Sequence, residues 1–276
     1  MIIRTGRLYQ TFKYLVYAAL AVNAGHFFIE NVAGSSTTYE DGVAFSDIIV
    51  AYTDSIDTVA WLILLLLLEL ETFVLPDERI KAGVEWTINI LTILCGGIIL
   101  YALYGYWATL WIPLGFEPYA GADPCSLLSG EWGFAVALDD YPPLDAQNCT
   151  ALAGEVFVNA KANLFATPEN LSLINRLAWT DVVNASVWVI IVAVLEAEVY
   201  LQSSKLFGTK FFFAYKSAKI LLYGVLFVCA YYWWMLGEPW DAWDAFLWLV
   251  AFFFIEMNML TWQEENAERR AAGFIK

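Results

Sequence analysis

The sequence has few basic residues and few of the residues that catalytic chemistry most often requires. Lysine and arginine number 14 against 29 aspartates and glutamates, and 276 residues include one histidine and four cysteines. The chain contains no P-loop, G-x-S-x-G, C-x-x-C or H-E-x-x-H pattern. One histidine also excludes a haem with two histidine ligands from a single chain. We therefore expect no enzyme and no resident cofactor, and the net charge of −15 argues against a nucleic-acid partner.

Apolar and aromatic residues are abundant instead, at 60% and 17% of the chain. Soluble proteins are about 45–50% apolar. Crossing a bilayer takes about 20 predominantly apolar residues in a helix, and six segments approach or exceed that length. They are residues 13–30, 56–75, 86–112, 179–201, 216–236 and 243–262. The sequence thus predicts an all-α polytopic membrane protein with six transmembrane helices.

The basic residues predict how the chain is oriented. With six crossings, all of the 14 lysines and arginines except Lys161 and Arg176 fall on one side of the membrane. Basic residues concentrate on the cytoplasmic side, so we expect both termini there, most simply in a bacterial inner membrane. Most of the acids fall on the outer side, where they create a field that attracts cations. Outer loops that merely avoid basic residues would explain the same distribution.

A long external loop is expected at about residues 113–178. It holds Cys125 and Cys149, and an oxidising compartment favours a disulfide between them. A loop of this length exceeds a simple connector, so we expect a small cap over the outer mouth. A partner-binding or shielding insertion is the alternative.

The second, fourth and sixth segments repeat one polar pattern, D-x2-[DN]-x3-W-x7-E-x-[EN], without a gap. Five columns of residues coincide. The first is Asp54, Asp181 and Asp241; the second is Asp57, Asn184 and Asp244; the Trp column is Trp61, Trp188 and Trp248; the Glu column is Glu69, Glu196 and Glu256; and the last is Glu71, Glu198 and Asn258. Apolar helices align easily by chance, but five columns of rare residues do not.

The repeat divides the chain into three two-helix hairpins, residues 1–75, 76–204 and 205–276, with the cap loop inserted in the second. All three hairpins point the same way, and parallel repeats are related by an axis along the membrane normal. The predicted architecture is therefore a six-helix bundle with pseudo-threefold symmetry. Gly96 and Gly97, in the third segment, indicate a close-packing or kink point.

Two of the columns have ordinary structural interpretations. Aspartate at a helix start caps free N–H groups and complements the helix dipole, and we favour that role for the first column. Tryptophan collects where a membrane meets water, so we interpret the Trp column as part of an interfacial aromatic belt.

The Glu column is harder to explain, because both hydrocarbon and the negative end of the helix dipole disfavour a carboxylate. The side chains could reach the inner headgroups, pair with Lys13 and Lys219 at similar depth, or be protonated and inert. In the functional hypothesis the three glutamates converge on the axis and form a cation-binding ring. The last column, interrupted by Asn258, would form a second, incomplete ring.

Taken together, the columns predict translocation of a cation, a proton or a small metal ion, along a path lined by the second, fourth and sixth helices. The expected partners are the lipid bilayer and the cation itself, and homo-oligomers or other membrane partners stay open. The alternative is a non-transporting subunit of a larger membrane complex, whose aromatic residues pack against protein, lipid or quinone.

Overall fold

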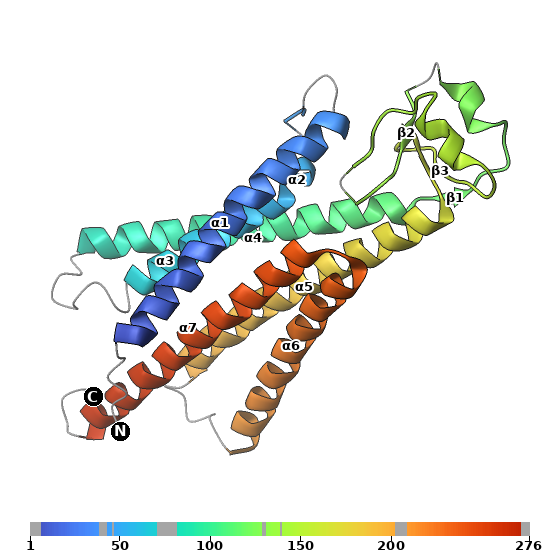
Figure 1. Cartoon of the computed structure of the whole chain (residues 1–276). Helices are drawn as coiled ribbons and strands as arrows, with labels where there is room; N and C mark the ends of the chain where they lie inside the picture. Colours follow the sequence, from blue (N-terminus) through green and yellow to red (C-terminus); the bar gives the residue numbers. More distant parts are fainter. Residues whose placement is uncertain are drawn as a thin grey trace.

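The protein is described by a computed structural model that covers residues 7–38, 43–45, 47–70, 82–128, 131–138, 140–201 and 209–271 (Figure 1). Seven α-helices occur in these ranges. They are α1 (Arg7–Thr38), α2 (Ile48–Ala51), α3 (Thr53–Glu69), α4 (Ala82–Leu114), α5 (Pro168–Leu201), α6 (Thr209–Leu236) and α7 (Pro239–Ala271). Between α4 and α5 lie β1 (Glu117–Pro118), η3 (Pro124–Leu127), β2 (Gly133–Phe134), η4 (Asn148–Leu152), β3 (Phe157–Asn159) and β4 (Leu164–Ala166).

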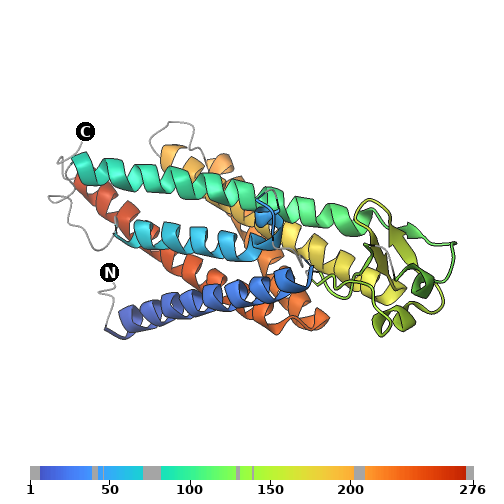
Figure 2. The same ribbon diagram turned by 90° about the horizontal axis from the view of Figure 1, so that it is seen from above.

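The six long helices form a closed ring. Each packs against its neighbour in the order α1, α3, α4, α5, α6, α7, and α7 returns to pack against α1. The first turn of α1 and the last turns of α7 lie at the end of the bundle opposite the β-strands (Figures 1 and 2). Around the ring, α3, α5 and α7, which carry the repeated columns, alternate with α1, α4 and α6.

Four helices, α1, α4, α5 and α6, are long and apolar enough to cross a membrane. These correspond to the first, third, fourth and fifth expected segments. The described part of α3 has 17 residues, and α7 carries Asp241, Asp244 and Glu256. Within the described residues neither helix is found to be long and apolar enough for a span. The chain therefore has the helices of a membrane protein.

Helix α5 begins at Pro168, before the end of the expected external loop near residue 178. The hydroxyl oxygen of Thr167 accepts a hydrogen bond from the backbone N–H of Asn170, at 3.2 Å. Proline suits the first position of a helix because it has no N–H to satisfy there. Thr-Pro-Glu-Asn is thus a helix-start signal that the length of the apolar run concealed.

The segment from Gly115 to Thr167 folds as a small cap at the ends of α4 and α5 (Figure 1). Its four strands form one sheet in the order β1-β3-β4-β2, with β2 and β4 parallel and the other pairs antiparallel. The predicted disulfide is confirmed: Cys125 and Cys149 are bonded and join η3 to η4. Phe165, fully buried, lies at the centre of the cap's hydrophobic core.

One glycine of α4 marks a close approach between helices. A Cβ atom on Gly105 would lie 2.7 Å from the Thr53 hydroxyl oxygen of α3. A Cβ atom on Gly96 or Gly97 would meet no described group within 4 Å, so the pair is not a close-packing point among the described residues; the kink alternative stays a prediction. The small residue that lets α3 and α4 approach is one that hydrophobic patterning does not single out.

Candidate functional site: an acidic cavity above a tryptophan cluster

The first three columns of the repeat line a single cavity of about 410 Å³ inside the ring of helices. All nine of their members contribute to its wall, three from each of α3, α5 and α7. They are Asp54, Asp57, Trp61, Asp181, Asn184, Trp188, Asp241, Asp244 and Trp248. Residues 54 and 241 lie in the first turns of α3 and α7, which places the cavity toward the end of the bundle that carries the cap.

The three tryptophans form one buried cluster, here called the tryptophan cluster. The ring centroid of Trp61 lies 6.4 Å from that of Trp188 and 6.4 Å from that of Trp248. Phe252 of α7 completes the cluster, with its ring 4.5 Å from Trp188 and 6.1 Å from Trp61. These aromatic rings fill the centre of the bundle where α3, α5 and α7 face one another.

The interpretation of the Trp column as an aromatic belt was therefore wrong. Different tryptophans occupy the outward positions: Trp86, near the start of α4, is 70% exposed, and Trp111, near its end, is 67% exposed. Trp234, near the end of α6, is 64% exposed. Exposed tryptophans at the two ends of apolar helices are typical of a membrane–water interface.

Capping does not explain the first column. Asp54 follows the N-cap position of α3, which Tyr52 occupies without a side-chain capping bond. Asp181 lies more than three turns inside α5, so it reaches no free N–H at a helix start. Asp241 lies in the first turn of α7, where a carboxylate complements the helix dipole. What the three members share is the cavity.

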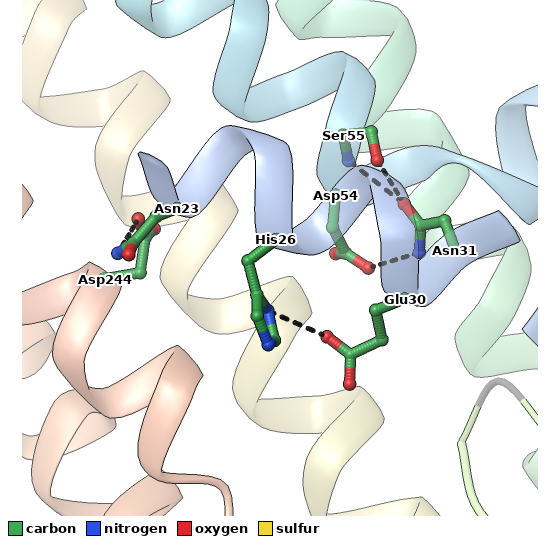
Figure 3. Close-up of polar contacts among 7 residues, drawn as sticks. All are labelled: Asn23, His26, Glu30, Asn31, Asp54, Ser55 and Asp244. Atoms are coloured by element: carbon green, nitrogen blue, oxygen red, sulfur yellow. Dashed lines mark hydrogen bonds and ion pairs between the residues drawn. The ribbon is translucent and has the colours of Figure 1, made fainter. Parts of the chain in front are cut away.

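Neutral donors from α1 hold two of the cavity's carboxylates (Figure 3). The amide nitrogen of Asn23 donates to Asp244 at 3.1 Å, and that of Asn31 donates to Asp54 at 3.5 Å. The side-chain oxygen of Asn31 also accepts a hydrogen bond from the backbone N–H of Ser55, at 3.3 Å. Both asparagines are buried. They orient the carboxylates and bring no positive charge to them.

The other helices of the ring supply two further neutral donors. The hydroxyl of Tyr106 on α4 donates to Asp57 at 3.4 Å, and the indole N–H of Trp233 on α6 donates to Asp181 at 3.1 Å. Sequence reasoning missed all four donors. For the asparagines a signal exists, since Asn23 and Asn31 are the two amides of an otherwise apolar segment, eight residues apart.

The cavity wall is strongly acidic. Besides the five aspartates of the columns it includes Glu30, Asp140 and Glu238, and no lysine, arginine or histidine of the described residues lines it. Asp140 comes from the cap, as do Ala137 and Leu138, so the cap covers part of the cavity. Carboxylates gathered in a cleft with apolar walls focus a negative field and raise the local concentration of cations.

The Glu column behaves differently, because its described members form ion pairs. Glu69 pairs with Lys13 of α1, and both side chains are buried. It also accepts a hydrogen bond from the Tyr17 hydroxyl at 3.5 Å. Glu256 of α7 pairs with Lys219 of α6 at 2.5 Å. Glu69 and Glu256 thus face lysines of the neighbouring helices instead of forming a carboxylate ring on the axis.

The two ion pairs have similar but not identical surroundings. Lys13 lies over the ring of Tyr14 at 5.2 Å from its centroid, and Lys219 lies over Tyr215 at 5.3 Å. The hydroxyl of Tyr223 donates to Glu256 at 3.1 Å, in the place that Tyr17 takes beside Glu69. The other members of these two columns, namely Glu71 and the side chains of Glu196, Glu198 and Asn258, lie outside the described residues.

Comparison with protein-family models, with curated proteins and with solved structures gave no match. The candidate site therefore stands on its own geometry. An acidic cavity lies beside the cap, a tryptophan cluster lies at its inner end, and Glu69 and Glu256, deeper in the bundle, are paired with lysines. Among the described residues no group of three histidine, cysteine or acidic side chains is arranged to hold a metal ion.

Proposed function

We propose that the protein moves a cation across a membrane through the centre of the helix ring, and that the acidic cavity is its outer binding site. One observation carries the proposal: nine residues that recur at fixed spacing in three segments line the same cavity. A packing role would not require carboxylates at five of the nine positions, because buried charges are costly when unpaired. A single acidic binding site inside the bundle explains why these residues recur in all three segments.

The proposal includes the finer architecture that the repeat predicts. The six long helices cross the membrane as three hairpins related by a pseudo-threefold axis, with both termini in the cytoplasm and the cap outside, in the bacterial inner membrane. The closed ring and the meeting of Trp61, Trp188 and Trp248 at 6.4 Å support this arrangement. Charged residues within membrane segments that face the interior of a bundle usually mark an ion pathway.

In this mechanism the tryptophan cluster acts as the gate. Aromatic rings in van der Waals contact leave no polar surface for a cation to follow, so the path is closed below the cavity. Movement of α7 against α3 and α5 would separate Trp248 and Phe252 from the other two rings. The ion pairs Lys13–Glu69 and Lys219–Glu256 join α1 to α3 and α6 to α7. Each pair would keep one hairpin rigid while the hairpins move relative to one another.

Reconstitution of the full chain in lipid vesicles tests the proposal. We expect an imposed gradient to drive cation uptake, followed with a proton-sensitive or cation-sensitive dye inside the vesicles. Asp57→Asn and Asp244→Asn should each lower the initial rate about tenfold, the lower end of the range for electrostatic focusing. Glu155→Gln, which removes one exposed carboxylate of the cap outside the cavity, is the matched control. Equal rates in all three variants and the native chain would contradict the proposal.

The second candidate is a subunit of a larger membrane complex that transports nothing itself. The observation that favours it is the outward aromatic surface, which includes Trp86, Trp111 and Trp234. Purification in a mild lipid-retaining detergent distinguishes the two functions. A stoichiometric partner protein together with an inactive isolated chain supports the subunit, whereas an isolated chain that moves cations supports transport.

A further inference from the structure

We propose that the cation held in the acidic cavity is an organic ammonium ion that carries at least one N–H group. The inference deepens the proposed function, on which it rests, because it names the ligand class of the same cavity. Four features carry it: the size of the cavity, its aromatic floor, the neutral donors on its carboxylates, and a buried acceptor without a donor.

The size favours an organic ligand over a bare inorganic ion. Cavities that bind small molecules measure roughly 300–1,000 Å³, and this one measures about 410 Å³. A desolvated calcium or magnesium ion needs several oxygens at about 2.0–2.6 Å converging on one point. The column carboxylates come from three different helices around the wall, and the described residues provide no cluster of three ligands for a metal.

The floor favours a cation with apolar substituents. It consists of the buried rings of Trp61, Trp188 and Trp248, joined by Phe252. A small hydrated inorganic ion gains nothing from apolar surface. An alkylammonium ion gains twice, since its alkyl groups leave water and its charge lies against the face of an indole, the best aromatic partner for a cation.

No lysine, arginine or histidine of the described residues lines the cavity beside its carboxylates. Asp244 and Asp54 accept from Asn23 and Asn31, and the deeper glutamate Glu69 is paired with a lysine instead. A carboxylate offers about four acceptor positions, so one amide donor leaves Asp244 able to accept from a ligand. Lysines thus pair with Glu69 and Glu256 below the tryptophan cluster, whereas Asp244 and Asp54 above it accept from neutral amides.

The fourth feature selects for an N–H group. The side-chain oxygen of Asn184 lines the cavity, is buried, and accepts no hydrogen bond from the described residues. Buried polar atoms in proteins are nearly always hydrogen-bonded. An ammonium N–H can donate to this oxygen, whereas a quaternary ammonium ion has no proton to give. Asn184 interrupts a column that has aspartate at its other two positions, Asp57 and Asp244.

Binding measurements on the purified full chain in detergent test the inference. The probes are the chloride salts of propylammonium, tetramethylammonium, potassium and calcium at matched ionic strength, and the readouts are intrinsic tryptophan fluorescence and titration calorimetry. We expect saturable binding of propylammonium, at least about tenfold tighter than that of tetramethylammonium or potassium, because a hydrogen bond to a charged group contributes about one decade of affinity or more.

Variants assign the binding to this cavity. Asp244→Asn and Asp57→Asn should each weaken propylammonium binding about tenfold or more, and either serves if the other fails to fold. Asn184→Ala should remove the preference for propylammonium over tetramethylammonium while tetramethylammonium affinity stays unchanged. Glu155→Gln should change neither affinity. Potassium or calcium binding as tightly as propylammonium, or cavity variants that bind like the native chain, would overturn the inference.

The binding assay and the vesicle assay can reject the ligand class and the transport function independently. Propylammonium binding without uptake into vesicles supports this ligand class and rejects transport. Uptake of protons or potassium without propylammonium binding supports transport and rejects this ligand class.

Discussion

Removing one partner of the buried Lys13–Glu69 ion pair should destabilise the protein strongly. The Lys13 side chain is 1% exposed and that of Glu69 is 7% exposed. Lys13→Met keeps the apolar stem but leaves a buried carboxylate whose remaining partners are the hydroxyls of Tyr14 and Tyr17. An uncompensated buried charge of this kind costs about 3–5 kcal/mol. We expect a large fall in the thermal unfolding midpoint, measured by tryptophan fluorescence in detergent.

The related pair provides the matched control. Lys219 and Glu256 are 14% and 22% exposed, and pairs nearer to solvent contribute less, down to about 0–1 kcal/mol at a surface. Lys219→Met should therefore lower the midpoint clearly less than Lys13→Met. The comparison isolates burial, because both substitutions remove a lysine beside a tyrosine-bound glutamate at the same position of the repeat.

A double variant distinguishes two effects of Lys13→Met: the loss of the ion-pair attraction and the cost of leaving the Glu69 carboxylate buried without a countercharge. Lys13→Met with Glu69→Gln removes both charges and keeps a carbonyl oxygen to accept from the tyrosines. Replacing both partners of a buried pair is often close to neutral, so the double variant should recover most of the midpoint. If the double variant is as unstable as Lys13→Met alone, or if Lys219→Met is equally harmful, the buried-charge explanation is refuted.

Three further predictions follow from the packing. Gly105→Ala should lower the free energy of unfolding by about 1–3 kcal/mol, because it overpacks α3 against α4. Gly96→Ala should raise it by up to about 1 kcal/mol, because no described group lies near the added Cβ. Chemical unfolding of both variants measures the difference. Trp61→Ala should raise cation leak through vesicles by opening the tryptophan cluster, and a leak no greater than that of Trp61→Phe would count against the gate. Replacing Cys125 and Cys149 by serine should cost the cap about 3 kcal/mol, from the entropy of a 24-residue loop, seen as faster proteolysis of the cap with the helices intact.

Several features could be predicted from residues alone because each depends on local chemistry. Apolar runs long enough to span a membrane identified α1, α4, α5 and α6. Two cysteines in a loop expected to face an oxidising compartment predicted the disulfide. The lysines named as alternatives for the Glu column are the ones that pair with Glu69 and Glu256, because depth along a helix follows from counting residues at a fixed rise.

The sequence could not predict which face of each helix points into the bundle. Helical phase places Asp54, Asp57 and Trp61 on one face of α3, but it does not say whether that face turns inward. In a soluble protein the apolar face is the inner one. In a membrane bundle lipid is as apolar as the core, so the usual signal disappears and the Trp column was assigned to the wrong surface.

The sequence by itself predicted the long apolar helices and the disulfide, and it contains the repeated polar pattern and the order of the acids along each helix. Only the tertiary structure decided which acids meet. The closed ring turns the first three columns inward to one cavity, while α1 and α6 bring lysines to Glu69 and Glu256. The physical reason is that an ion pair or a shared cavity depends on distances between helices, and those are set by which faces pack together, not by any spacing along one chain.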